Sequence, residues 1–102
     1  MTKYILCCGL NDKDTKNQEI NTLDAFKIVS NIFAKMTGGA TIQEVHGVYT
    51  HDDGTIVIET SLKCEVLGAE YESIVKTIEL LKAALNQESI LLETIESNYC
   101  FM

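Results

Sequence analysis

Residues 40–66, ATIQEVHGVYTHDDGTIVIETSLKCEV, decide the fold because they contain two strand patterns joined by a turn. Residues 40–50 alternate imperfectly between apolar and polar side chains, and residues 55–66 alternate cleanly. The sequence His-Asp-Asp-Gly at 51–54 separates them, and Asp-Gly is typical of a tight hairpin turn. The stretch therefore predicts an antiparallel hairpin, with a bulge expected at Gly47.

A helix is predicted on either side of this hairpin. In INTLDAFKIVSNIFAKMTGG, Asn21 or Thr22 can cap the start, and the Gly-Gly pair at 38–39 ends the helix. The second helix is expected from about Ala69 to Leu85. We expect the buried faces to be Leu23, Phe26, Val29, Ile32, Phe33 and Met36 in the first helix and Tyr71, Ile74, Val75, Ile78, Leu81 and Leu85 in the second.

Two further strands complete the pattern. Residues 3–10 are a continuous apolar run, which is typical of a central strand covered on both faces. Residues 89–96 form the last strand, which 99–102 is expected to extend. The order β-α-β-β-α-β predicts an α+β, ferredoxin-like sandwich: an antiparallel four-stranded sheet with two helices on one face, in a single domain over residues 1–102.

Charge and composition exclude several classes of partner. Eight basic residues against fifteen acidic ones give a net charge of −7, and no basic stripe is present to neutralise phosphates. We therefore predict neither a nucleic-acid nor a membrane partner. The first apolar run is too short to span a membrane and is not followed by a cleavage site, so a cytoplasmic protein is expected.

The sheet face away from the helices is predicted to be apolar. Leu91, Ile95, Tyr99 and Phe101 share one side of the last strand, and the first strand has little polarity on either side. Exposed apolar faces of this kind are usually interfaces or ligand floors. We therefore expect a homodimer through the open sheet face.

No metal or cofactor is predicted. Asp12 and Asp14 suggest a calcium loop, but the pattern fails because Lys16, Asn17 and Leu23 stand at required ligand or glycine positions. The loop is better interpreted as a flexible polar segment, a candidate lid over the open sheet face. The acidic hairpin turn is expected to be a solvated turn rather than a metal site.

The cysteines are expected to be reduced thiols that pack as small apolar residues. Cys7 and Cys8 are neighbours on one strand and therefore point to opposite faces. We expect the first and third strands to be parallel neighbours, which would place Cys7 or Cys8 near Cys64 and would leave Cys100 at the opposite end.

Three interpretations are open for the polar residues of the hairpin and of the segment before the last strand. A ligand-binding site is predicted at Tyr49, Glu59, His46, Gln87, Glu88 and Ser89. His46, Tyr49 and Glu59 are alternatively candidates for general acid–base catalysis, although no nucleophile motif or cofactor fingerprint accompanies them. A third interpretation is that Glu59 merely forms an ion pair with Lys63 or Lys3 on a solvated sheet.

A pattern of short motifs resembles a small uncharacterised family of bacterial and phage proteins. The pattern consists of Gly39, Thr41, Gly47, Tyr49, Gly54, Glu59, Gln87, Glu88 and Ser89. The run GLNDKDTK is also similar to phage or mobile-element proteins of low-GC Gram-positive bacteria.

The resemblance implies no defined activity. It favours a phage-encoded, non-enzymatic binding module that sequesters a small ligand, such as a signalling nucleotide, or inhibits a host defence protein. The alternative is a small dimeric α/β-barrel enzyme of the cofactor-independent oxygenase or isomerase kind.

Overall fold

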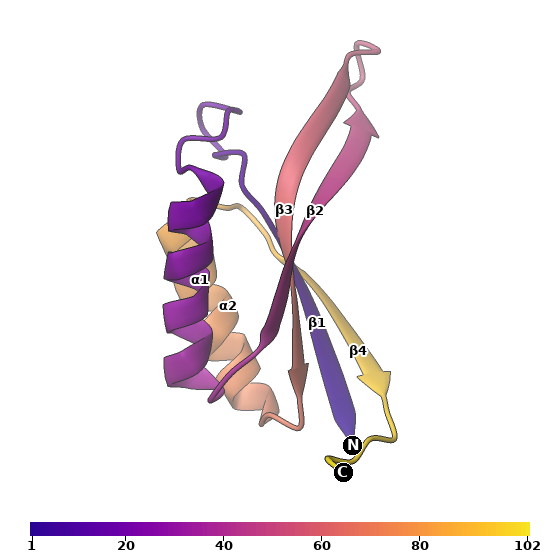
Figure 1. Ribbon diagram of the computed structural model, residues 1–102. Coiled ribbons are helices and arrows are strands. Elements are labelled where there is room, and N and C mark those ends of the chain that lie inside the picture. The colour runs from indigo at the N-terminus through magenta and orange to yellow at the C-terminus, as the bar shows by residue number, and fades with distance from the viewer.

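The computed structural model describes residues 1–102 and has the predicted element order. The elements are β1 (Thr2–Gly9), α1 (Thr22–Met36), β2 (Thr41–Thr50), β3 (Ile56–Leu67), α2 (Tyr71–Leu85) and β4 (Leu91–Glu96). The strand order is β2-β3-β1-β4, every neighbouring pair is antiparallel, and both helices cover one face of the sheet (Figure 1). The predicted ferredoxin-like α+β fold is confirmed.

The direction of β3 corrects one expectation. β1 and β3 are antiparallel neighbours, with Leu6 opposite Cys64, so the expected parallel pairing is wrong. The reason is topological: β3 is the returning arm of a hairpin, and it lies between β1 and β2. Cys8 and Cys64 nevertheless both lie in the core, whereas Cys100 is exposed in the tail after β4.

Helix α1 packs on the sheet through a face rotated from the predicted one, although Val29 and Phe33 are buried as expected. Its buried residues are Ala25, Val29 and Phe33, whereas Leu23 and Phe26 are exposed. Residues four apart line one side of a helix, and the small Ala25 side chain allows close approach to the sheet. The predicted cap is present, because the Asn21 side chain accepts the N–H of Asp24 at 2.9 Å.

Helix α2 shows a similar rotation. Ile74, Leu81 and Leu85 are buried as expected, but Tyr71 and Val75 are exposed. Thr77 takes a fully buried position, and its hydroxyl donates to the Ser73 carbonyl at 2.7 Å. This internal hydrogen bond removes the cost of burying the hydroxyl, so a polar residue is accommodated where sequence periodicity favours an apolar one.

The core lies between the helices and the inner face of the sheet. β1 contributes alternate residues to it, and β3 contributes Leu62, Cys64 and Val66. The contributions of β1 and the residue after it are Tyr4, Leu6, Cys8 and Leu10. The open sheet face is mixed rather than uniformly apolar, because exposed Leu91 and Ile95 lie opposite Cys7 and Lys3 of β1.

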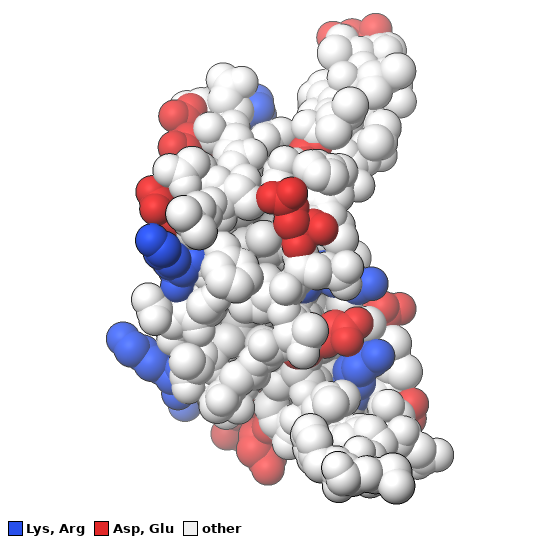
Figure 2. Space-filling view, viewed as in Figure 1, with Lys and Arg blue, Asp and Glu red and all other residues white.

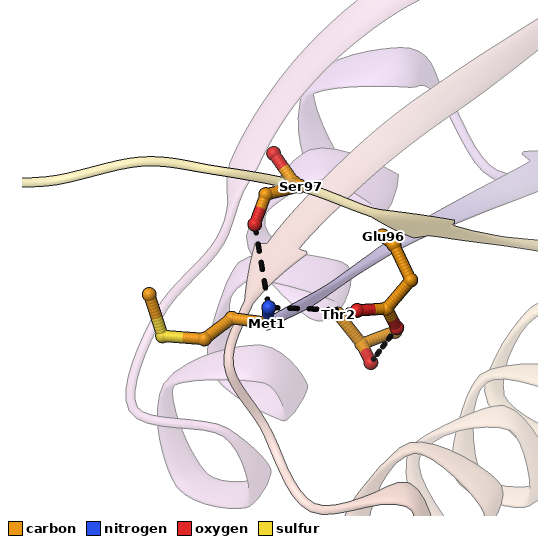
Figure 3. A network of polar contacts seen from close by, with 4 residues as sticks. All are labelled: Met1, Thr2, Glu96 and Ser97. Carbon is orange, nitrogen blue, oxygen red and sulfur yellow. Dashed lines mark hydrogen bonds and ion pairs between the residues drawn. The ribbon is translucent and has the colours of Figure 1, made fainter.

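The last strand is shorter than predicted. β4 ends at Glu96, and residues 99–102 form no strand. The N-terminal ammonium of Met1 donates to the Ser97 carbonyl at 3.3 Å and lies 3.5 Å from Glu96, to which Thr2 also donates a hydrogen bond (Figure 3). These contacts tie the end of β4 to the start of β1, at the end of the sheet remote from the hairpin tip.

The β2–β3 hairpin continues beyond the helices as a free two-stranded arm (Figure 1). We use "the arm" for residues 46–60, because pairing of β1 with β3 ends at Ser61. Pairing along the arm is one to one, with Gly47 opposite Glu59, so the predicted bulge is absent. Val48, Ile56 and Ile58 are exposed on one face of the arm. Apart from its acidic tip, the upper arm shows almost no charge in Figure 2.

No helix of the chain is long and apolar enough to cross a membrane.

Candidate functional site

A cavity of about 210 Å³ lies at the base of the arm. Three segments form its walls: the loop after β1 with Asn11, Asp12, Lys13 and Lys16; the hairpin with Tyr49, His51, Val57 and Glu59; and the segment before β4 with Gln87, Glu88 and Ser89. Most of these side chains are polar, so the cavity suits a ligand with several hydrogen-bonding or charged groups.

Strand alternation brings the predicted hairpin residues to this cavity. Tyr49 lies opposite Val57 and Gly47 lies opposite Glu59, so all four lie on one face of the arm. The Tyr49 ring meets the His51 ring edge-on, with centroids 5.5 Å apart and planes at 86°. The structure thus places Tyr49 and Glu59 in one wall and the predicted residues Gln87, Glu88 and Ser89 in another.

His46 is not brought to the cavity. It lies opposite Thr60 on the other face of the arm, with its Nδ1 3.5 Å from the threonine hydroxyl. Its Nε2 lies 3.7 Å from a carboxylate oxygen of Glu44. The predicted combination of His46, Tyr49 and Glu59 assumed a bulge at Gly47, and without that bulge His46 and Tyr49 face opposite sides.

Glu59 is positioned by the end of β1. One of its carboxylate oxygens accepts the backbone N–H of Asn11 at 2.9 Å. A Cβ added to Gly9 would lie 2.6 Å from the same oxygen, so the absence of a side chain at Gly9 makes room for the carboxylate. The solvated-sheet interpretation required an ion pair between Glu59 and Lys3 or Lys63. The structure contains neither ion pair.

The loop from Asn11 to Gln18, which the sequence predicts to be flexible, makes several hydrogen bonds to the end of α2. The Asn86 side chain donates to Asp12 and Asp14, both at 2.9 Å, and the backbone N–H of Lys13 donates to the Asn86 carbonyl at 3.1 Å. Asp12 also accepts the backbone N–H groups of Asp14 and Thr15. The Asn86 amide, followed by these backbone donors, lowers the pKa of Asp12 from its usual value.

The end of α2 supports both this loop and the third wall. Asn86 caps the helix in the left-handed conformation, with φ 48° and ψ 56°. The next residue, Gln87, donates its amide to the Asn11 carbonyl at 2.7 Å. Lys16 also has a positive φ, of 65°. This conformation is common for an Asn at the end of a helix, whereas it is unusual for a residue such as Lys16.

The loop wall is only partly predictable from the sequence. Asn11, Asp12, Lys13 and Lys16 were not predicted as ligand contacts, although their loop was singled out as a candidate lid. His51 and Val57 were assigned to a turn and a strand without a binding role. The available signal was topological, because the antiparallel pairing of β1 with β4 places the residues after β1 beside those before β4.

The cysteines and the acidic residues offer no other site of comparable definition. A hydrogen bond with Cys8, followed by burial, raises the pKa of the Cys64 thiol far above its usual range. Burial, followed by the charge of Cys8, raises the pKa of Cys7. Both thiols are therefore protonated near neutral pH and poorly nucleophilic. No group of three or more His, Cys, Asp or Glu side chains is arranged to hold a metal ion.

Comparisons with solved structures identify two kinds of similar protein. A phage SAM lyase in the apo state is 25% identical, with 92% of this chain and 78% of that chain covered and a TM-score of 0.65. The phage SAM lyase in complex with S-methyl-5′-thioadenosine is also 25% identical, covers 93% of this chain and 80% of that chain, and has a TM-score of 0.63.

CutA from Synechococcus elongatus is similar in fold alone. It is 11% identical, with 94% of this chain and 77% of that chain covered and a TM-score of 0.60. No model of a known protein family matches the sequence, and a search of curated proteins finds no match. The similar structures share the ferredoxin-like fold, and among them is a phage enzyme that acts on a small molecule.

Proposed function

We propose that the protein binds S-adenosylmethionine, or a closely related adenosyl sulfonium, in the cavity at the base of the arm and cleaves it. The observation that supports this proposal is the 25% identity to a phage SAM lyase over 92% of the chain. The polar cavity supplies suitable contacts, because Tyr49 offers a ring and a hydroxyl, and Glu59 and Glu88 offer carboxylates to a cationic ligand. In a phage-infected cell such an activity would remove a host metabolite.

The chemistry requires little from the protein beyond positioning. Cleavage of the bond between sulfur and the amino-acid carbon sends the electron pair to sulfur, and the leaving group is the neutral thioether S-methyl-5′-thioadenosine. A lyase uses no water, so the carbon must either bond to the ligand's own carboxylate or lose a proton from its neighbour. A cavity that holds the ligand in one conformation favours the first route, and Glu59 is the candidate base for the second.

Sequestration without turnover is the second candidate function. It is favoured by the hydrogen bonds that already engage the cavity's acidic groups, since Glu59 accepts the Asn11 N–H and Asp12 accepts the Asn86 amide. Groups engaged in this way are well placed to hold a ligand and less free to exchange protons. A protein of this kind would reduce the free concentration of the ligand by binding it.

Self-association through the open sheet face also remains a proposal. Leu91 and Ile95 are exposed on that face, and burying them against a second copy would be favourable. The charged residues Lys3, Lys63 and Glu65 lie on the same face, so a partner surface must supply complementary charges. Sedimentation of the wild type and of Leu91→Glu tests this proposal, and an unchanged monomeric sedimentation coefficient for both would refute it.

The functional proposal is tested by incubating the purified protein with S-adenosylmethionine and separating the products by liquid chromatography. Time-dependent release of S-methyl-5′-thioadenosine supports cleavage, and proton NMR of the remaining fragment separates the lactone from the unsaturated amino acid. Saturable binding in calorimetry without any product supports sequestration. If the protein neither binds nor cleaves the compound, both candidates are wrong.

A further inference from the structure

The lysines of the cavity are confined to one of its three walls. Lys13 and Lys16 both belong to the loop after β1, which also contributes the carboxylate of Asp12. The hairpin and the segment before β4 contribute the carboxylates of Glu59 and Glu88 and no lysine. A ligand that carries both charges would lie with its anionic group towards the loop and its cationic group towards the other walls.

The acidic side chains that neighbour the two lysines in sequence accept hydrogen bonds from Asn86. Asp12 and Asp14 both accept hydrogen bonds from the neutral side chain of Asn86, at 2.9 Å. The salt bridges of the structure involve neither Lys13 nor Lys16. The loop therefore presents two ammonium groups to the cavity beside the Asp12 carboxylate, and neither ammonium forms a salt bridge with it.

The two lysines differ in how far their ammonium groups are engaged. The Lys16 ammonium donates to the Lys13 carbonyl at 2.7 Å, which folds this side chain back along the loop. The Lys13 side chain makes no hydrogen bond, whereas its backbone N–H is held by the Asn86 carbonyl at 3.1 Å. Lys13 thus combines a backbone held by Asn86 with an ammonium group at the cavity wall that makes no hydrogen bond.

We propose that Lys13 is a specificity-determining residue that binds a carboxylate of the ligand, so that the cavity selects adenosyl compounds with an intact amino-acid group over their decarboxylated forms. This inference rests on the proposed function, because it concerns the same cavity and the same class of ligand. The lysine ammonium is suited to the role because it attracts a carboxylate as a point charge, without a fixed hydrogen-bond geometry. Its flexible side chain can also adjust to the position of the carboxylate.

The test uses two uncleaved ligands that differ only in the carboxylate: S-adenosylhomocysteine and its decarboxylated form. Calorimetry with the wild type is expected to show tighter binding of S-adenosylhomocysteine. Lys13→Gln should lower that preference about fivefold, which is the effect of losing about 1 kcal/mol from a partly exposed ion pair. Lys13→Arg should retain most of the preference, and added salt should reduce it in the wild type.

Lys27→Gln is the matched control, because it removes the same charge from an exposed position on α1 outside the cavity. It should leave the preference unchanged. Equal weakening of both ligands by Lys13→Gln, or an unchanged preference, would overturn the role of Lys13 while leaving the proposed function intact. Failure of the wild type to bind any adenosyl compound would overturn both.

Discussion

The carboxylate of Glu59 accepts the backbone N–H of Asn11 at 2.9 Å, although 48 residues separate the two in sequence. This hydrogen bond joins the base of the arm to the loop after β1. Gly9 permits it, because a Cβ at that position would lie 2.6 Å from the same carboxylate. Glu59 therefore shapes the cavity as well as lining it, and the two roles can be separated by mutation.

The role in shaping the cavity predicts coupling between Gly9 and Glu59. Gly9→Ala should displace the carboxylate and lower the free energy of unfolding by about 1 kcal/mol, the usual contribution of one hydrogen bond. In a Glu59→Ala background the same change at Gly9 should have almost no effect, because the conflicting group is gone. Urea unfolding of the four proteins measures this coupling. Additive effects would show that Gly9 and Glu59 act independently.

The charge of Glu59 is tested by Glu59→Gln, which keeps an oxygen able to accept the Asn11 N–H. We expect stability close to that of the wild type and at least fivefold weaker binding of S-adenosylmethionine, because a cationic ligand loses its partner. Calorimetry and urea unfolding measure the two effects separately. Unchanged affinity in a stable Glu59→Gln protein would remove the carboxylate from ligand recognition.

Asn86 is predicted to contribute both a backbone conformation and two hydrogen bonds. Asn86→Gly retains the left-handed conformation but loses the bonds to Asp12 and Asp14, so it should be less stable than the wild type. Asn86→Ala should be less stable again by about 1 kcal/mol, because a Cβ disfavours that conformation. Thermal or urea unfolding ranks the three proteins. Equal stability of the Gly and Ala variants would contradict the conformational contribution.

The lowered pKa of Asp12 predicts that the folded protein loses stability in acid. This pKa is lowered in the folded protein, first by the Asn86 amide and then by backbone N–H groups. A lowered carboxyl pKa stabilises the fold above the unfolded-state pKa, and the contribution is lost as the pH falls through the folded-state pKa. Asp12→Asn should therefore flatten the pH dependence of unfolding below about pH 4, the ordinary aspartate range. Identical slopes for the two proteins in that range would contradict the prediction.

Tyr49 provides a test of how the cavity binds the adenosyl group. Tyr49→Phe keeps the ring and its edge-on contact with His51, whereas Tyr49→Ala removes both. If the ring contacts the ligand, the Ala variant should bind at least about fivefold more weakly, since stacking on an aromatic side chain contributes about 1–3 kcal/mol. Val48→Ala is the control, because Val48 lies on the opposite face of the arm. Equal losses for the Ala variants at 48 and 49 would indicate disruption of the arm rather than loss of a contact.

The element order was predictable because local patterns determine it. The clean alternation over 55–66 indicates a strand, and turn residues mark both of its ends. The buried faces of the two helices were harder to predict from the sequence. Phe26 and Tyr71 fit an apolar helical stripe but are exposed in the fold. The sheet selects the buried face through close packing at Ala25 and through the internal hydrogen bond of Thr77.

The candidate site was predictable where it depends on strand alternation alone. Glu59 is predicted as a ligand contact, and the structure places it in the cavity wall. The loop wall depends instead on hydrogen bonds from Asn86 to Asp12 and Asp14, across more than 70 residues. Such pairings are set by tertiary structure and leave no periodic signal in the sequence. His46 was misplaced because a single extra residue in a strand would reverse every side chain beyond it.

The proposed function places the ligand in the cavity at the base of the arm. Titration of ¹⁵N-labelled protein with S-adenosylhomocysteine, followed through the amide chemical shifts, tests this placement most directly. Saturable changes are expected at Asn11, Lys13, Tyr49, Glu59 and Gln87, with little change at Ile5 or Ile95 on the sheet face. Absence of saturable change, or changes confined to the sheet face, would contradict it.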